Sequence, residues 1–210
     1  MPRLITGLDA ARIAANLERV REQIAREDVR ILAAVKYVPL EELGALREAG
    51  VTLLGENRAQ DLEAKATAYP DFDWHFIGQL QSRKVKQILP HATLIHSVAS
   101  ESALDQLARH GTPETEILLE VNVAGEDGKA GIAPSELPHY LERAPCRVVG
   151  LMTMPPFTDD PERSRPHFAR LKQLADEHGL TELSMGTSQD FAVAAAEGAT
   201  IVRIGTTLYT

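Results

Sequence analysis

The chain has 210 residues, of which 44% are hydrophobic and 25% are charged, and its formal net charge is −8. This composition is that of a soluble globular protein, and the acidic balance argues against a nucleic-acid partner, whose phosphates require a basic face. No apolar stretch reaches the roughly 20 residues that cross a bilayer, residues 1–6 lack the apolar core of a signal peptide, and one cysteine excludes an internal disulfide, so we expect a cytoplasmic protein without a membrane partner.

A helix is predicted first, at about residues 8–26, because its apolar residues recur mostly at helical spacing and Thr6 or Asp9 can cap its start. Apolar runs bounded by turn residues then alternate with helical patterns. The predicted strands are 30–35, 51–54, 74–77, 93–97, 116–123, 147–152, 182–185 and 200–204. The predicted helices are 40–49, 57–68, 82–89, 100–110, 134–143, 160–178 and 188–197.

Eight strands that alternate with helices predict the α/β class and a single (β/α)8 TIM barrel with an extra N-terminal helix, because right-handed crossovers make consecutive strands parallel. No linker or repeat is evident, so residues 1–210 are predicted to form one domain. The sequence ends at Tyr209-Thr210, and we expect no helix after the eighth strand. The N-terminal helix would then brace the gap left there. An open, doubly wound sheet is the alternative.

In such a barrel, functional groups lie at the carboxyl ends of the strands. Lys36 follows the first apolar run, Ile31-Leu32-Ala33-Ala34-Val35. A lysine forms a Schiff base only as the neutral amine, and desolvation in a barrel mouth favours that form. The alternative is a strand-end lysine that extends into solvent.

An anion site is predicted after the last two strands. Gly186-Thr187-Ser188 leads into a helix, and Gly205-Thr206 follows the eighth strand. Free backbone N–H groups at helix starts suit a phosphate, and the loops after strands seven and eight form the recurrent phosphate site of TIM barrels. The alternative for Ser188 is a helix cap without a ligand. Together with Lys36, such a site suits a phosphorylated aldehyde.

Arg203 lies two residues before Gly205, so its side chain shares a face of the strand with Gly205 and Ile201. If that face is inward, the guanidinium is a buried charge that needs a partner. A heteroaromatic nitrogen or a ligand oxygen is one candidate, and the carboxylate of Glu120 is another. The seven histidines show no metal-binding spacing, so no metal site is predicted.

Several segments, in order along the chain, resemble the pyridoxal-phosphate homeostasis protein family. They are Ala34-Val35-Lys36, Leu54-Gly55-Glu56-Asn57-Arg58-Ala59-Gln60, Trp74-His75-Phe76-Ile77-Gly78-Gln79-Leu80-Gln81-Ser82-Arg83-Lys84, Ile95-His96-Ser97-Val98, Glu120-Val121-Asn122-Val123, Gly150-Leu151-Met152-Thr153-Met154, Leu183-Ser184-Met185-Gly186 and Val202-Arg203-Ile204-Gly205-Thr206. Family members often carry His, Asn and Met where this chain has Gln79, Arg83 and Thr187.

The resemblance implies a barrel like the N-terminal domain of alanine racemase, with pyridoxal 5'-phosphate held by Lys36 as a Schiff base. It places Ser188, Gly205 and Thr206, with Gly186 and Thr187 beside them, around the phosphate. It also places Arg203 at the pyridine nitrogen and Asn57 close to the cofactor. The implied role is to buffer and deliver pyridoxal phosphate, which maintains vitamin B6, amino-acid and keto-acid pools.

An arginine at the pyridine nitrogen leaves that nitrogen unprotonated, which weakens the ring as an electron sink. A racemase also needs a second acid or base, which alanine racemases take from a C-terminal domain that this chain does not have. We therefore expect little or no turnover and assign no catalytic residue. We also expect pyridoxal-phosphate-dependent apo-enzymes as partners, and a monomer. The alternatives are a racemase-type enzyme, a Schiff-base aldolase without cofactor, and a ligand-free interaction module.

Overall fold

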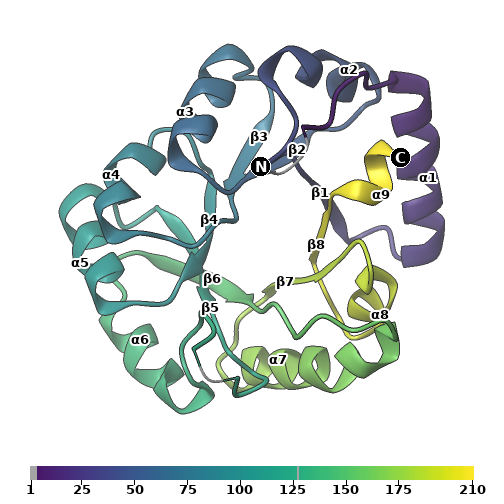
Figure 1. The fold of residues 1–210 in the computed structure, drawn as a ribbon. Helices are drawn as coiled ribbons and strands as arrows, with labels where there is room; N and C mark the ends of the chain where they lie inside the picture. Colours follow the sequence, from purple (N-terminus) through teal and green to yellow (C-terminus); the bar gives the residue numbers. More distant parts are fainter. Residues whose placement is uncertain (1–3, 127) are drawn as a thin grey trace.

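The computed structural model describes residues 4–126 and 128–210, and eight parallel strands in them close into a barrel in chain order. Figure 1 shows the strands as an inner ring surrounded by helices. The strands are β1 (Arg30–Ala34), β2 (Leu53–Glu56), β3 (Asp73–Phe76), β4 (Leu94–Val98), β5 (Glu116–Glu120), β6 (Arg147–Met152), β7 (Glu182–Thr187) and β8 (Ile201–Ile204). The eight predicted strands and the TIM barrel are confirmed, and pairing of β1 with β8 excludes the open sheet.

Apart from α9, the helices fall where the sequence predicts them, and several begin with a 3-10 turn. They are α1 (Ala10–Ile24), α2 (Leu43–Glu48), α3 (Ala59–Ala68), α4 (Val85–Ile88), α5 (Glu101–His110), α6 (Leu137–Arg143), α7 (Arg165–Glu177), α8 (Phe191–Ala196) and α9 (Thr206–Tyr209). The 3-10 turns are η1 (Leu40–Glu42), η2 (Ser82–Lys84), η3 (Pro134–Glu136) and η4 (Pro161–Ser164). In the described part of the chain, no helix is long and apolar enough to cross a membrane.

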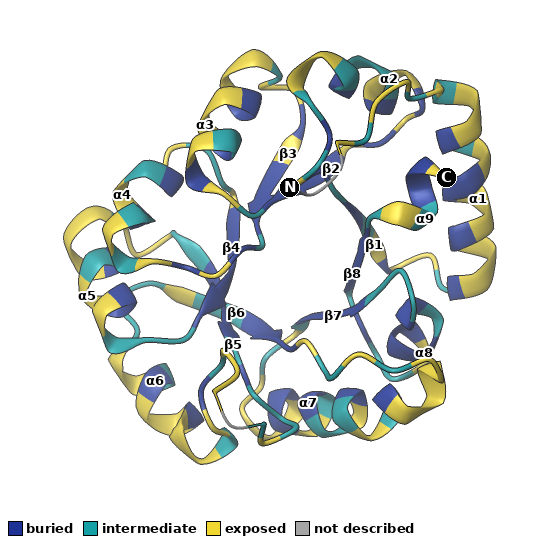
Figure 2. Ribbon diagram, in the orientation of Figure 1, coloured by how far each residue is buried: buried dark blue, intermediate teal, exposed yellow. Residues whose placement is uncertain are grey.

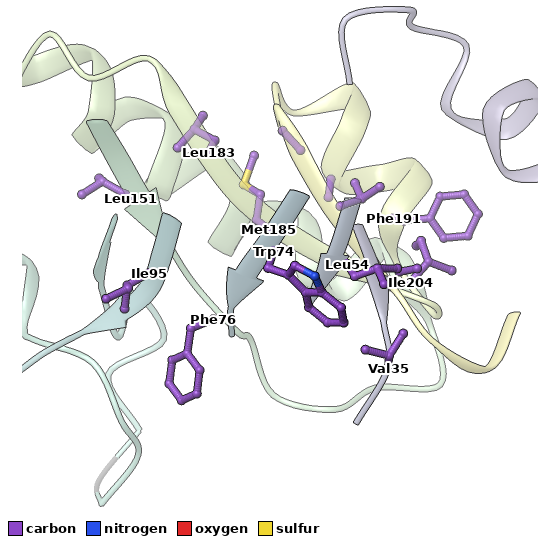
Figure 3. Packing of buried hydrophobic residues seen from close by; sticks show 14 of the residues in the cluster. Val35, Leu54, Trp74, Phe76, Ile95, Leu151, Leu183, Met185, Phe191 and Ile204 are labelled. Carbon is purple, nitrogen blue, oxygen red and sulfur yellow. The ribbon is translucent and has the colours of Figure 1, made fainter. Parts of the chain in front are cut away.

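The alternation of side chains along each strand creates two apolar layers. One layer lies between the strands and the helices, and Figure 3 shows part of it, including Val35, Trp74 and Ile204. The second lies inside the barrel, and we call it the inner cluster: Leu32, Leu53, Leu94, Leu118, Met152 and Ile201. The strands are therefore buried on both faces, as Figure 2 shows, whereas the helices expose their outer sides.

The gap after β8 is filled by two helices rather than one. Asp9 caps α1 by accepting from the amide of Arg12 at 2.7 Å, and α1 packs against α9, α2 and α8. The bracing role predicted for α1 is thus confirmed. The expectation that no helix follows β8 was wrong, because four residues suffice for one turn, closed by the bond from the Leu208 amide to the Gly205 carbonyl at 2.9 Å.

Candidate binding site at the carboxyl ends of the strands

Strand pairing brings Lys36 beside the loop after β8. Ala34 of β1 is paired with Gly55 of β2, and Ala33 is paired with Ile204 of β8. Lys36 comes two residues after Ala34, so it lies between the ends of β2 and β8. Its side chain is exposed, and its Nζ lies 5.0 Å from the centre of the Tyr37 ring. The amine therefore stands exposed at the carboxyl-end mouth of the barrel.

The loops after β7 and β8 are joined by one hydrogen bond. The Gly205 amide donates to Ser188 Oγ at 3.1 Å, so Ser188 is held against the end of β8. A Cβ added to Gly205 would meet nothing closer than the Cβ of Ala34 at 3.9 Å, so this side of Gly205 is uncrowded. Helix α9 begins at Thr206, and the first amides of a helix have no partner within it. This corner of the mouth can accept an anion.

Gly186 and Thr187 are the last two residues of β7, just before Ser188, and each is constrained by contacts within the protein. The amide of Thr187 donates to Asp190 Oδ1 at 2.7 Å, and its hydroxyl donates to the same oxygen at 3.2 Å. Gly186 has φ +88°, and a Cβ there would come within 2.5 Å of the Ala194 Cβ. These two residues therefore shape the loop and let α8 pack against β7.

Arg203 points into the barrel, as its strand position predicts, and its guanidinium is held by neutral groups. Its Nη1 donates to Ser184 Oγ at 3.0 Å, and its Nη2 donates to the Thr153 carbonyl at 2.9 Å. Burial lowers the pKa of Arg203 to about 10, although Glu120 and Asp190 favour its charged form. Glu120, the protein partner considered from sequence, makes no hydrogen bond to Arg203 and acts on it only through its charge. The hydrogen bonds of Arg203 use at most three of the five guanidinium N–H groups, so Arg203 can still donate to a ligand.

Asn57, at the end of β2, is fixed through its backbone. Gly78, after β3, packs so closely that a Cβ there would lie 2.1 Å from the Asn57 carbonyl oxygen. The Asn57 amide donates to Glu56 Oε2 at 2.8 Å. Its side-chain Oδ1 is buried, and no donor from the described residues reaches it. A buried acceptor without a donor is costly, so this oxygen is a candidate ligand contact.

A buried ion pair beneath the mouth was not predicted from the sequence. Lys65 of α3 donates to Glu56 Oε1 at 2.9 Å and to the Val35 carbonyl at 2.8 Å. The Glu56 side chain is inaccessible to solvent, and burial raises its pKa while Lys65 lowers it. The pair fixes the residue before Lys36 and the amide of Asn57 together. The sequence feature that could have indicated the pair is Lys65, a charged residue on the same helix face as Leu62 and Ala66.

Two histidines inside the barrel were also not predicted from the sequence, where histidines were considered only as metal ligands. His96 of β4 and His75 of β3 are almost completely buried. His96 Nδ1 lies 2.8 Å from Ser184 Oγ, and its Nε2 lies 2.9 Å from His75 Nδ1. The side chain of His96 lies two residues after that of Leu94, so alternation along the strand places it inside the barrel with the inner cluster. This alternation could have predicted its position from the sequence. Both histidines connect to Arg203 through Ser184.

The structure thus brings six of the eight predicted residues to one mouth: Lys36, Asn57, Ser188, Arg203, Gly205 and Thr206. The amine can attack a carbonyl, the loops after β7 and β8 can hold an anion, and Arg203 can donate to a ligand from below. Gly186 and Thr187 support the loop that carries Ser188. Asn122, another strand-end residue, binds its own loop through the amide and carbonyl of Glu126.

Comparison with known proteins gives consistent matches over nearly the whole chain. The model of the family described as "Alanine racemase, N-terminal domain" matches residues 8–210. The pyridoxal phosphate homeostasis protein of Aquifex aeolicus is 39% identical, over 95% of each chain. PipY of Synechococcus elongatus, solved with pyridoxal phosphate (PLP) bound, is 33% identical with a TM-score of 0.83, over 94% of this chain and 100% of that one.

A more distant match concerns the fold alone. Alanine racemase of Corynebacterium glutamicum has a TM-score of 0.78 at 16% identity, and the match covers 100% of this chain and 63% of that one. The barrel is therefore shared with an enzyme that has a further part with no counterpart in the 210 residues.

Proposed function

The chain belongs to the family of pyridoxal phosphate homeostasis proteins, with the barrel of the alanine racemase N-terminal domain, and we propose that it binds pyridoxal 5'-phosphate, buffers it and delivers it. In this role it maintains vitamin B6 and the amino-acid and keto-acid pools that depend on it. The carrying observation is the pairing of β1 with both β2 and β8, which sets Lys36 beside the anion corner at Ser188, Gly205 and Thr206.

The residues at the mouth fit the chemical groups of pyridoxal phosphate. The phosphate would lie at the uncrowded side of Gly205 and at the first amides of α9. The ring hydroxyl is a donor of the kind that the buried Asn57 Oδ1 lacks. Arg203 retains N–H groups that can donate to the pyridine nitrogen. Lys36 would hold the aldehyde carbon through its amine, with release of one water.

The protein environment favours storage over turnover. A donor such as Arg203 leaves the pyridine nitrogen unprotonated, and electron withdrawal by the ring is then weak. Lys36 is exposed rather than enclosed, so water would have access to its amine, and a bound aldehyde would be released there by hydrolysis. A reversible covalent bond at an open mouth suits a carrier, and pyridoxal-phosphate-dependent apo-enzymes in the cytoplasm are the proposed recipients. We propose that the carrier is monomeric.

The visible absorbance of the purified protein tests the cofactor and its anchor. We expect a yellow band after incubation with pyridoxal phosphate, bleached by borohydride, with the reduced adduct on the peptide that contains Lys36. Lys36→Ala removes the band, whereas Lys86→Ala, which changes an exposed lysine of α4, keeps it. A wild-type protein that stays colourless contradicts the proposal.

Deuterium exchange at the α-carbon of amino acids tests the second half of the proposal. The loaded protein is incubated with each amino acid in D2O, and incorporation is measured by mass spectrometry. We expect exchange far below ordinary enzyme rates of about 1 per second or more. Exchange at such rates would make the protein a racemase-type enzyme.

A further inference from the structure

A continuous line of hydrogen-bonding side chains crosses the barrel interior from the mouth to its opposite end. It begins at Arg203, passes Ser184 and His96, and continues to His75. His75 Nε2 then lies 3.5 Å from Asp73 Oδ2. The five residues come from β8, β7, β4 and β3, which brings groups more than a hundred positions apart in the sequence into one line.

The Arg203 end of the line dictates the direction of the bonds within it, because a guanidinium only donates hydrogen bonds. Arg203 donates to Ser184 Oγ, and His96 Nδ1 is the acceptor that the described residues offer to the Ser184 hydroxyl. His96 therefore carries its proton on Nε2 and donates to His75 Nδ1. His75 in turn carries its proton on Nε2, 3.5 Å from the Asp73 carboxylate, so both histidines are neutral.

The surroundings of the line make this assignment stringent. Ser184 and His96 are inaccessible to solvent, and His75 is 1% exposed. They lie within the inner cluster of leucines, methionine and isoleucine, where an unpaired polar group costs more than in water. Burial, together with the charge of Arg203, holds the pKa of His96 well below its usual value, which agrees with a neutral ring.

The far end of the line meets solvent in a cavity of about 280 Å3 at the amino ends of the strands. The charged and titratable groups that face His75 there are Arg30, Asp73, Glu116, Arg147 and Glu182. Arg30 pairs with Glu182 and Arg147 with Glu116, each at 2.7 Å. Asp73 also receives the hydroxyl of Thr93. The bond from Thr93 holds Asp73 beside His75, and the two ion pairs neutralise the other charges around the cavity.

We propose that Ser184, His96, His75 and Asp73 are positioning residues, which fix the Arg203 guanidinium through one directed line of hydrogen bonds in which both histidines are Nε2–H tautomers. What Arg203 then does at the mouth rests on the proposed function, whereas the tautomers are set by the protein alone. A second proton on His75 would force His96 to donate to Ser184, which then receives two donors and has no acceptor for its own hydrogen.

Nitrogen NMR of histidine-labelled protein, without added cofactor, tests the line directly. Long-range proton–nitrogen spectra identify which ring nitrogen carries the proton, and the His75→Asn and His96→Asn variants assign the signals. Near pH 7.5 we expect protonated Nε2 and unprotonated Nδ1 in both rings. A proton on Nδ1 of either ring overturns the proposal, whether or not the protein binds pyridoxal phosphate.

A matched pair of serine variants tests the positioning role. Ser184→Ala removes the group between Arg203 and His96, whereas Ser164→Ala removes a buried hydroxyl that has no partner among the described residues. In the unloaded Ser184→Ala protein, the His96 Nδ1 resonance should move to the position of a nitrogen without a hydrogen bond. Ser164→Ala should leave it unchanged.

The same pair is then compared with pyridoxal phosphate. We expect Ser184→Ala to raise the dissociation constant about tenfold, as for a lost bond to a charged group, and to shift the pH dependence of the visible band. Ser184→Thr retains the hydroxyl and should restore both. Affinity and band equal to those of Ser164→Ala would overturn the positioning role. Failure of the wild type to bind would instead contradict the proposed function and leave the tautomer result standing.

Discussion

Replacement of Lys65 by methionine tests how the mouth is held. The change removes both the partner of Glu56 and the donor to the Val35 carbonyl. Loss of one member of a buried ion pair costs about 3–5 kcal/mol. Glu56 can escape its unpaired charge by taking up a proton. From its ordinary pKa of 4.5, that uptake at pH 7 costs about 3.4 kcal/mol, at about 1.36 kcal/mol for each pH unit.

We therefore expect Lys65→Met to lose about 4 kcal/mol of unfolding free energy at pH 7, including about 1 kcal/mol for the Val35 carbonyl. The folded variant holds a proton on Glu56 that the unfolded chain releases above pH 4.5. Stability should consequently rise as the pH falls from 7 toward 4.5, by about 1.4 kcal/mol per unit relative to the wild type. Urea unfolding at several pH values measures both effects.

Two controls separate this explanation from a general effect of the substitution. Lys86→Met changes an exposed lysine and should stay within about 0.5 kcal/mol of the wild type. Lys65→Met combined with Glu56→Gln removes the titrating group and should abolish the additional pH dependence. A Lys65→Met variant that loses less than about 1 kcal/mol and keeps the wild-type pH profile would refute the reasoning.

Three further predictions concern the loop, the interior and the helix pair. Gly186→Ala should lose about 2–4 kcal/mol of unfolding free energy in urea, because both the positive φ and the contact with Ala194 oppose a Cβ. Gly179→Ala, at φ +67° with nothing within 4 Å of the added Cβ, should lose only about 1 kcal/mol. Equal losses would show that the contact with Ala194 does not contribute. His96 has a folded-state pKa well below 6.5, so stability should fall as pH drops below 6.5, by up to about 1.4 kcal/mol per unit more than in His96→Asn; parallel profiles would rule this out. Asn16→Ala should cost about 2 kcal/mol in thermal or urea unfolding, since the buried Asn16 Nδ2 donates to the Leu208 and Thr210 carbonyls at 3.0 Å, and an unchanged midpoint would show that these bonds do not hold α9.

The barrel could be predicted because each strand is a short apolar run and each connection is long enough for a parallel crossover. Boundaries were less accurate at β5, where the predicted strand extended to residue 123 and the observed one ends at Glu120. The chain beyond Glu120 remains apolar at Val121 and Val123, and a strand pattern does not show where pairing stops. Val121 makes only an isolated bridge to Ile132.

The mouth could be predicted in outline because strand ends in a barrel share one face, which brought Lys36, Arg203 and Gly205 together without knowledge of contacts. The Glu56–Lys65 pair and the line through His96 could not, because each depends on which side chains meet across strands or between a helix and a strand. Thr187 has the same explanation. The sequence places its hydroxyl near the anion site, but it does not show that this hydroxyl donates to Asp190.

The packing of α1 against α9 has a consequence for synthesis on the ribosome. The apolar side of α1, including Ile13, Leu17 and Val20, leaves the exit tunnel early, whereas the carbonyls that Asn16 binds lie 192 and 194 positions later. Translation at 5–20 residues per second separates the two events by roughly 10–40 seconds. For most of that interval, α2 has been made but α8 and α9, which α1 also contacts, have not. The nascent chain therefore exposes part of the apolar side of α1 until residues 191–210 emerge, which makes this helix the expected contact for ribosome-associated chaperones.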